Sequence, residues 1–398
     1  MNRFYFDHNA TTPLAPEVAQ VITEALRSGF GNPSSVHQEG QRARQFLETA
    51  RRRVARLVMA DPAEIVFTSG GTESNNLAIL GCVRNVETGC ARHVITTAIE
   101  HPSALEPCRH LEREGVDVTI LPVSEDGVVD PEDVRRALRP ETVLVSVMHA
   151  NNETGVIQPV REIAAILQAA RDQGQDVYLH CDGVQAPGRI PVNLETLGAD
   201  LYSMSGHKLY GPKGVGALYA RKSVRLSPTQ FGGRQEHAKR PGTENVTAAV
   251  ALAAALELAS TSERLEKIKL LRDRFECKLF VELENISING GGAERLPNTS
   301  NIYFDGVDGG SLVIALDLKG FAISSGSACS SGSIEPSHVL MAMGKSHKKA
   351  RQCVRFSMGY TNTLRQVDEL ADAVAATVRQ FRARRHSSSQ RSVPGVPA

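Results

Sequence analysis

Between residues 62 and 220 the sequence alternates short apolar, β-rich runs with amphipathic helical patterns. The runs include EIVFTS, HVITTAI, TVLVSVMHA and VYLHCD, and segments such as SALEPCRHLEREG and VREIAAILQAARDQG lie between them. Apolar strands that alternate with helices are typical of a mostly parallel sheet covered by helices on both faces. In such sheets ligands bind at the carboxyl ends of the strands. We therefore expect an α/β fold whose functional residues directly follow its strands.

A second pattern begins near residue 260, where a long charged helix precedes the short strands TSNIYF and CVRFSM and a final helix. This change indicates a smaller α+β domain. We expect residues 15–258 to form the large domain, and residues 1–14 together with 259–381 to form the small domain. The end of the chain, 382–398, is basic and rich in Ser and Pro, so it is predicted to be disordered.

Composition argues against several classes of function. Lys and Arg total 45 and Asp and Glu total 44, so the basic surplus of a nucleic-acid-binding protein is missing. The start of the sequence lacks the apolar segment of a signal peptide, and no stretch reaches the about 20 apolar residues that span a bilayer. The seven cysteines include no CxxC pair, which argues against a disulfide framework or a zinc site. We therefore expect a cytoplasmic protein with free thiols, no metal, and neither nucleic acid nor a membrane as partner.

The stretch FTSGGTESNNLAIL reads as a strand, a Gly-Gly turn and the start of a helix. Gly71 lets the backbone approach a ligand closely, while the helix start offers free N–H groups and the hydroxyl of Thr72. Such an arrangement can bind a phosphate group. Taken alone, the motif more often marks an ordinary turn with a helix cap.

Two other strands end in groups that suit pyridoxal 5'-phosphate (PLP). Asp182 ends VYLHCD, with Gln185 three residues later, and Ser205, His207 and Lys208 end or follow LYSMS. A lysine in a ligand crevice can act as an imine-forming amine, and a carboxylate can hold the protonated ring nitrogen of PLP. Each residue alone has an ordinary explanation, such as a helix cap or a solvated side chain. Together, a phosphate cradle, a carboxylate and a lysine at successive strand ends favour a PLP site.

His101 follows a third strand, and Asn151 and Asn152 follow a fourth. A histidine there can stack on a cofactor ring or transfer protons near neutral pH, although each of these residues is more often a polar loop residue. The stretch ISSGSACSSGS places Cys329 among Ser, Gly and Ala, which fits either a linker or a reactive sulfur on a mobile loop. A lone cysteine does not decide between the two.

Several motifs in order resemble the NifS/IscS family of cysteine desulfurases, within the fold-type I, class-V aminotransferase-like PLP enzymes. They are YFDHNATTP, GNPSSVH, FTSGGTESNN, MHANNETG, SGHKLYGPKGVGALY, RPGTEN and SSGSACSSGSIEPSHVL, and they cover the chain to about residue 380. The motif SSGSAC looks like the class with an extended catalytic loop. The resemblance implies a fold-type I PLP-dependent transferase that acts as a homodimer.

The resemblance also implies roles for single residues. Lys208 would bond to PLP as an imine and later move the Cα proton, and His101 would stack on the ring and assist proton transfers. Asp182 would pair with the pyridinium nitrogen, and Gln185 would hydrogen-bond the ring hydroxyl. The phosphate would be held by Gly71, Thr72, Ser205, His207 and, from a second subunit, Thr243.

For the substrate, the resemblance implies that Arg355 and Asn152 hold the carboxylate of L-cysteine, with Asn152 also beside the cofactor. The Cys329 thiolate would take the substrate sulfur as a persulfide while L-alanine leaves. The sulfur would pass to an acceptor, such as an iron–sulfur scaffold protein, for iron–sulfur cluster or other sulfur-cofactor biosynthesis. A mobile loop would suit Cys329, because its sulfur must reach both the cofactor and a partner.

Two other functions stay open, and a third has little support. A selenocysteine lyase, or another fold-type I PLP enzyme, would not depend on Cys329, because selenide can leave without a protein thiol. A non-catalytic sulfur-relay partner would use Cys329 only as a carrier, but it has no need of Lys208, Asp182 and His101 together. A nucleic-acid-binding function would rest on the basic segment 382–391 alone.

Overall fold

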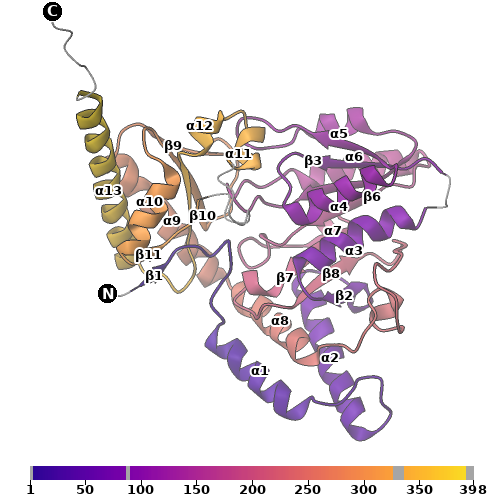
Figure 1. Cartoon of the computed structure of the whole chain (residues 1–398). Helices are drawn as coiled ribbons and strands as arrows, with labels where there is room; N and C mark the ends of the chain where they lie inside the picture. The colour runs from indigo at the N-terminus through magenta and orange to yellow at the C-terminus, as the bar shows by residue number, and fades with distance from the viewer. Residues whose placement is uncertain (1–2, 87–89, 326–335, 391–398) are drawn as a thin grey trace, which may run out of the picture.

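The computed structural model describes residues 3–86, 90–325 and 336–390 of the 398-residue chain, without the side chains of 386–390. The large domain is built on a seven-stranded sheet with the order β2-β8-β7-β6-β5-β3-β4 (Figure 1). Its strands are β2 (Ile65–Thr68), β3 (His93–Thr97), β4 (Asp117–Leu121), β5 (Thr142–Met148), β6 (Tyr178–Asp182), β7 (Leu201–Ser205) and β8 (Gly216–Ala220). Strands β4, β3, β5, β6 and β7 run parallel, and β8 pairs antiparallel with both β7 and β2. The prediction of a mostly parallel α/β sheet is confirmed.

Helices cover both faces of this sheet. Successive strand residues point to opposite faces, so Ile65 packs into one core cluster and Val66 into the other. One face is covered by α3 (Gly71–Arg84) and α4 (Pro102–Arg113). The other is covered by α2 (Gln38–Leu57), α6 (Val160–Asp172) and α8 (Val246–Ala259). The remaining helical segments of this domain are α1 (Pro16–Ser28), η1 (Pro62–Glu64), α5 (Pro131–Ala137), α7 (Leu194–Leu197), η2 (Gly206–Lys208) and η3 (Glu236–Ala238).

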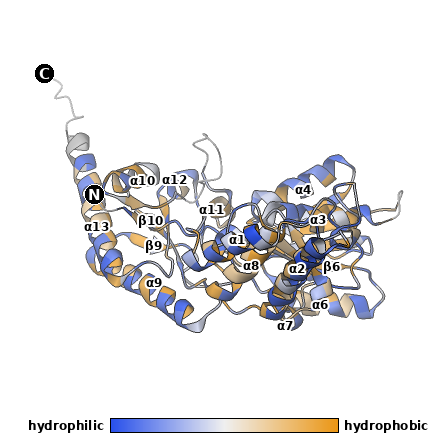
Figure 2. Ribbon diagram, turned by 90° about the horizontal axis from the view of Figure 1, so that it is seen from below, coloured by the Kyte–Doolittle hydropathy of each residue, from blue (hydrophilic) through white to orange (hydrophobic). Residues whose placement is uncertain are grey.

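Helix α8 is apolar apart from Thr247 and Glu257, because most of it is enclosed between the sheet and helices α1 and α2 (Figure 2). No single helix in the described part of the chain is long and apolar enough to cross a membrane. By length and composition only, the pair α8 and α9 (Ser262–Glu282), bent by 64°, passes that test together. The burial of α8 inside the large domain accounts for its apolar composition.

The small domain has a separate core. Its antiparallel sheet has the order β12-β10-β9, with β9 (Ile286–Ile288), β10 (Thr299–Phe304) and β12 (Cys353–Ser357). Helices α9, α10 (Gly309–Leu318) and α13 (Leu364–Gln390) pack against it, while α11 (His338–Ala342) and α12 (His347–Ala350) precede β12. The start of the chain joins this domain, since β1 (Phe4–Tyr5) pairs in parallel with β11 (Phe321–Ala322) and Phe6 is buried in its core.

The end of the chain corrects one expectation. We expected residues 382–398 to be disordered, but α13 continues to Gln390. Arg382 donates hydrogen bonds to three backbone carbonyl oxygens of the small domain, those of Glu284, Asn285 and Asp305. These contacts hold the helix against the domain beyond the expected boundary, where composition alone indicated a solvated tail. Residues 391–398 lie outside the described residues.

Candidate active site

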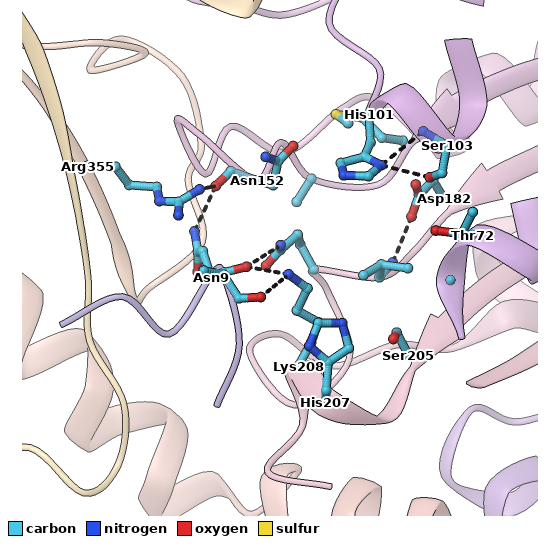
Figure 3. A pocket seen from close by; sticks show the side chains of 16 residues that line it. Asn9, Thr72, His101, Ser103, Asn152, Asp182, Ser205, His207, Lys208 and Arg355 are labelled. Atoms are coloured by element: carbon cyan, nitrogen blue, oxygen red, sulfur yellow. Dashed lines mark hydrogen bonds between the residues drawn. The ribbon is translucent and has the colours of Figure 1, made fainter. Parts of the chain in front are cut away.

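A cavity of about 290 Å³ lies at the carboxyl ends of strands β6 and β7, beside the loops that follow β3 and β5 (Figure 3). Residues of the large domain, the amino-terminal segment and β12 of the small domain all line it. The following predicted site residues line this one cavity: Gly71, Thr72, His101, Asn152, Asp182, Gln185, Ser205, His207, Lys208 and Arg355. The position agrees with the rule that ligands bind at strand carboxyl ends in such sheets.

Two predicted site residues are not part of this lining. Thr243 is exposed, lies just before α8 and is not among the residues that line the cavity of its own chain. Cys329 lies outside the described residues. The described chain on either side of it reaches the cavity region: Ser324 pairs as a β-bridge with Arg355, and Ser337 donates a 2.5 Å hydrogen bond to Glu153, the neighbour of Asn152.

Other lining residues were not assigned a role from the sequence: Asn9, Ala10, Ser103, Met148, Ala150 and Val184. Asn9 and Ala10 lie within YFDHNATTP, one of the motifs that carried the resemblance, so a signal for them was present. Ser103 follows His101 by two residues, at the start of α4, where a hydroxyl usually serves only the helix. Met148, Ala150 and Val184 carry no polar group by which the sequence could mark them.

The start of α3 forms a cradle for an anion. Gly70, before the helix, has a φ of 153°, which residues with a Cβ rarely adopt, and its position offers no side-chain cap. A Cβ on Gly71 would lie 2.6 Å from Cγ2 of Val184, so the backbone is bare here because the space is closed to a side chain. The first N–H groups of a helix attract negative charge. Thr72, Ser205 and His207 line the same cavity.

His207 is neutral at the pH of most cells. Burial lowers the pKa of His207 to about 4, and the positive charges of Lys208 and Lys213 act in the same direction. Its Nδ1 lies 3.1 Å from Oγ1 of Thr11. A neutral imidazole can still offer one N–H to an anion in the cradle.

Asp182 and Lys208 place a carboxylate and an amine in the same cavity. Asp182 is buried at the end of β6, where its carboxylate accepts hydrogen bonds from Asn75 Nδ2 over 2.7 Å and from the backbone N–H of Val184 over 3.0 Å. Lys208 Nζ, in η2, donates to the carbonyl oxygens of Asn9 over 2.6 Å and Ala10 over 2.7 Å. The amino-terminal segment therefore positions the amine (Figure 3).

His101 caps the start of α4 with its side chain. Its Nδ1 accepts a hydrogen bond from the backbone N–H of Ser103 over 3.1 Å and lies 2.7 Å from the Ser103 hydroxyl. Burial lowers the pKa of His101, an effect that the charge of Asp182 opposes and that of Lys208 reinforces. The ring is thus held in the cavity by one nitrogen.

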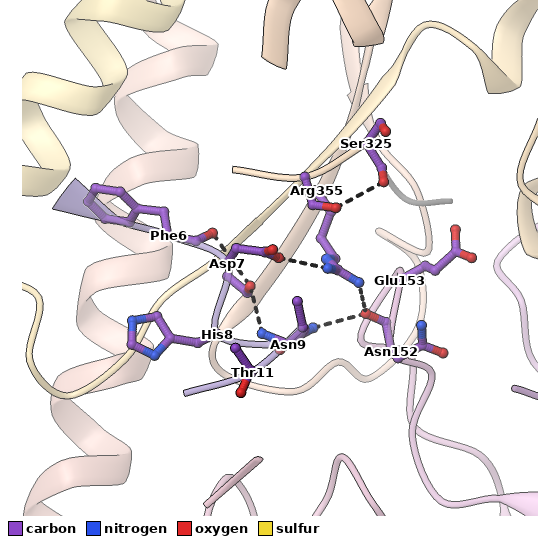
Figure 4. A network of polar contacts seen from close by, with 12 residues as sticks. Phe6, Asp7, His8, Asn9, Thr11, Asn152, Glu153, Ser325 and Arg355 are labelled. Carbon is purple, nitrogen blue, oxygen red and sulfur yellow. Dashed lines mark hydrogen bonds and ion pairs between the residues drawn. The ribbon is translucent and has the colours of Figure 1, made fainter. Parts of the chain in front are cut away.

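Arg355 brings a positive charge from the small domain (Figure 4). One of its terminal nitrogens donates to the carbonyl oxygen of Asn152 over 2.9 Å, and the other lies 2.7 Å from Oδ1 of Asp7. The side chain is only 3% exposed, and its Nε has no hydrogen-bond partner among the described residues. A buried guanidinium with an unused N–H is suited to a carboxylate ligand.

The cavity fits PLP. Gln185 Nε2 donates to the carbonyl of Asn9, while its Oε1 is buried and accepts no hydrogen bond from any described residue. An unpaired buried acceptor costs about 1–3 kcal/mol, so a ligand hydroxyl at this point would remove a penalty. PLP presents a phosphate, a ring hydroxyl, a ring nitrogen and an aldehyde, for which the α3 cradle, Gln185, Asp182 and Lys208 offer matching groups.

The chain is similar over nearly its whole length to known proteins. The sequence profile of the family described as Aminotransferase class-V matches residues 4–370. A relative from Dictyoglomus turgidum (strain DSM 6724 / Z-1310), named cysteine desulfurase IscS, is 44% identical over 380 residues, which are 95% of each chain. A protein of the same name from Pseudomonas aeruginosa (strain UCBPP-PA14) is 45% identical over 385 residues, which cover 95% of this chain and 93% of the relative. A solved structure named NifS-like protein matches with a TM-score of 0.87 and 36% identity, covering 95% of this chain and 99% of its own.

Proposed function

The chain belongs to the class-V aminotransferase family, and from that premise we propose that it passes the sulfur of L-cysteine through Cys329 to an acceptor protein. The protein is a PLP-dependent cysteine desulfurase, which converts L-cysteine to L-alanine. The observation that carries the assignment is the meeting of Lys208, Asp182 and the α3 cradle in one cavity. A protein that only relayed sulfur would have no use for this combination.

PLP, when bound, supplies an electron sink that stabilises negative charge at the substrate Cα. The α3 cradle would hold its phosphate, Asp182 its ring nitrogen and Gln185 its ring hydroxyl, and Lys208 would supply the amine that bonds to it. His101 would lie against the ring. The carboxylate of Asp182 is held by Asn75 and by the backbone of Val184, so it presents negative charge at a fixed point.

Different residues around the cavity bind the substrate and transfer its protons. Arg355 binds the carboxylate of L-cysteine, with Asn152 beside it, and so fixes the Cα proton relative to Lys208. The Lys208 amine removes the Cα proton and later returns a proton. His101, which lines the same cavity, also gives or takes protons.

Sulfur leaves the substrate in a step that uses Cys329. The thiolate of Cys329 attacks the substrate sulfur, forming a new S–S bond while the Cβ–S bond breaks. The electron pair of the broken bond stays on Cβ, which takes a proton, so that L-alanine leaves and Cys329 keeps a persulfide. The persulfide sulfur then moves to a thiol of an acceptor protein, for which an iron–sulfur scaffold protein is our first choice.

We extend the proposal to a cytoplasmic homodimer. Phe30, Val36 and Phe231 are 76, 85 and 91% exposed. They lie in the loops that also carry residues 33–34 and 234–237, which line one shared hollow. Exposed apolar side chains gathered in one region support a contact with a second copy of the chain. Such a contact would explain why Thr243, in the neighbouring segment, faces solvent in its own chain. A reducing cytoplasm would keep the thiols of both subunits available.

The first test measures L-alanine formed from L-cysteine by PLP-loaded protein, comparing wild type with Cys329→Ala. We expect the substitution to abolish alanine formation while the imine absorbance of the cofactor is unchanged. Cys277→Ala is the matched control, because Cys277 is an exposed, free cysteine and should be dispensable. Equal alanine formation by wild type and Cys329→Ala would instead indicate a lyase. No alanine from either protein, with a reductant present, would favour the non-catalytic sulfur-relay function.

A further inference from the structure

The side chains of Asn75 and Ser103 connect Asp182 to His101 by hydrogen bonds. Neither residue contacts the reacting atoms in the proposed mechanism. Asn75, on α3, is fully buried and donates from Nδ2 to Oδ2 of Asp182 over 2.7 Å and to the hydroxyl oxygen of Ser103 over 2.8 Å. The hydroxyl oxygen of Ser103 in turn lies 2.7 Å from Nδ1 of His101 (Figure 3). The contacts form one continuous chain from the carboxylate to the imidazole.

The donors and acceptors in this chain fix one another. A carboxylate only accepts hydrogen bonds, so Asn75 must turn its NH2 group toward Asp182. Both hydrogens of that NH2 group are then used, one by Asp182 and one by the Ser103 oxygen. The hydroxyl of Ser103 therefore accepts from Asn75 and has its own single proton left for Nδ1 of His101.

These contacts determine which nitrogen of the His101 imidazole carries the proton. Nδ1 of His101 faces two donors, the hydroxyl of Ser103 and the backbone N–H of Ser103, so it carries a lone pair and no proton. The proton of the neutral ring is then on Nε2, the nitrogen that is not turned to Ser103. Protonation of Nδ1 would place an N–H against a backbone N–H, which disfavours the imidazolium form.

Charged groups around the ring act on it as well. Burial lowers the pKa of His101 most; Lys208 in η2 and His338 on α11 also disfavour the charged imidazole, whereas Asp182 at the end of β6 favours it. Glu100, the preceding residue, is fully buried, and burial raises its pKa to about 8, so it is mainly uncharged near neutral pH. The hydrogen bonds and the surroundings therefore favour the same neutral state.

We propose that Asn75 and Ser103 are positioning residues that hold His101 as a neutral imidazole with its proton on Nε2, and tie this ring to the carboxylate of Asp182. The inference rests on the proposed function, in which His101 gives and takes protons and Asp182 holds the cofactor ring. Because the neutral ring already carries its proton on Nε2, it can donate a hydrogen bond or the proton from Nε2 without first changing tautomer. Asn75 Oδ1 is buried and has no partner among the described residues, so the amide is placed for its two donors and not for its oxygen.

The test uses variants of Ser103 in the PLP-loaded protein. Ser103→Ala removes the hydroxyl donor and keeps the backbone, whereas Ser103→Thr keeps both. Nitrogen-15 NMR of the histidine side chains, with His101 assigned by the signal missing from His101→Gln, reports the tautomer and the pKa directly. We expect Nε2–H in wild type and in Ser103→Thr. In Ser103→Ala we expect a higher pKa of His101, because its neutral form has lost a donor, and a matching shift of the acidic limb of kcat/KM to higher pH.

Asn75→Leu gives a second, independent variant, with a side chain of the same branched shape. Without the amide, the Ser103 oxygen is free to accept from Nδ1, so the pKa of His101 should again rise. The proposal is overturned if wild type carries the proton on Nδ1, or if His101 titrates identically in wild type, Ser103→Ala and Asn75→Leu. The NMR measurement needs no turnover. If wild type makes no alanine yet shows the expected tautomer and its dependence on Ser103, the desulfurase function fails and the positioning of His101 stands.

Discussion

At the scale of single residues, Glu153 lies between the cavity and the chain that leads to Cys329. Its carboxylate accepts a hydrogen bond from Ser337, the second described residue after the segment 326–335. Burial raises the pKa of Glu153 to about 7, and the charge of Arg355 opposes this only in part. A carboxyl group with this pKa changes its charge in the range where cells operate.

The raised pKa of Glu153 predicts a pH-dependent stability. The folded protein holds this proton more tightly than the unfolded chain, whose reference pKa is 4.5, so the contribution is fully present below pH 4.5 and is lost as the pH rises through about 7. At about 1.4 kcal/mol per pKa unit the contribution reaches roughly 3 kcal/mol at most. Glu153→Gln should therefore be more stable than wild type at pH 8.5 but not at pH 5, as measured by urea unfolding. A stability difference that does not change between these pH values would contradict the prediction.

The positions of single residues differ in how far the sequence reveals them. Lys208 and Asp182 could be predicted to meet because the carboxyl ends of parallel strands share one edge of a sheet. Asn75 and Ser103 could not, since each lies within a helix pattern where a polar residue usually faces solvent or caps the backbone. Only the crossing of α3 and α4 places them between Asp182 and His101. The predicted roles of the cavity residues stay predictions until variants are measured.

At the scale of elements, η3 is an unusual turn that a buried ion pair holds in place. Its three residues, Glu236, His237 and Ala238, have φ values of 45°, 58° and 62°, a left-handed conformation that costs about 1–2 kcal/mol per residue. Glu236 offsets this cost through a two-contact ion pair with Arg51, 2.7 Å at each oxygen, in which both side chains are almost fully buried. Glu236 also accepts the backbone N–H of Phe67 on β2. The turn is thus fastened to the sheet beside the segment that carries Thr243.

Removing Glu236 should be costly. Glu236→Ala leaves Arg51 buried with only the half-exposed Glu48 as counter-charge, so we expect a loss of about 3–5 kcal/mol in the free energy of unfolding. Glu257→Ala is the matched control, because Glu257 also pairs with arginines but is 43% exposed, and should cost at most about 1 kcal/mol. Chemical denaturation of both variants measures the difference. Equal losses would show that η3 does not depend on the buried pair.

Sequence patterns predicted some helices and strands but missed the end of another helix. The strands of the large sheet stood out because most of them are apolar runs between turn residues. The end of α13 did not stand out, since RARRHSSSQ has the composition of a solvated tail. Residue 382 is held against the small domain by the contacts of Arg382 with carbonyl groups 77 to 98 residues away in the chain, which no local pattern records.

At the scale of the whole molecule, the cavity exists only because both domains and the amino-terminal segment meet there. Lys208 comes from the large domain, Arg355 from the small domain, and the carbonyl groups that hold the amine come from residues 9 and 10. The first residues return to the small domain, where β1 pairs with β11. A fourth contribution, Thr243 of a second subunit, would complete the phosphate site in the homodimer that we propose.

Mixing two inactive or impaired variants tests whether Thr243 acts across the dimer. Lys208→Ala should lose alanine formation by at least about 10²-fold. Thr243→Ala should bind PLP about tenfold more weakly or worse, because it loses a hydrogen bond to a charged group. The two variants are unfolded and refolded together so that mixed dimers form. In a mixed dimer, the site with an intact Lys208 receives an intact Thr243 from the other subunit. PLP affinity and activity should therefore be restored at one site in each mixed dimer. A mixture of Lys208→Ala with wild type gives the reference level. If Thr243 acted within its own chain, that same site would keep the defect, and the mixture would show only the weak PLP binding of Thr243→Ala.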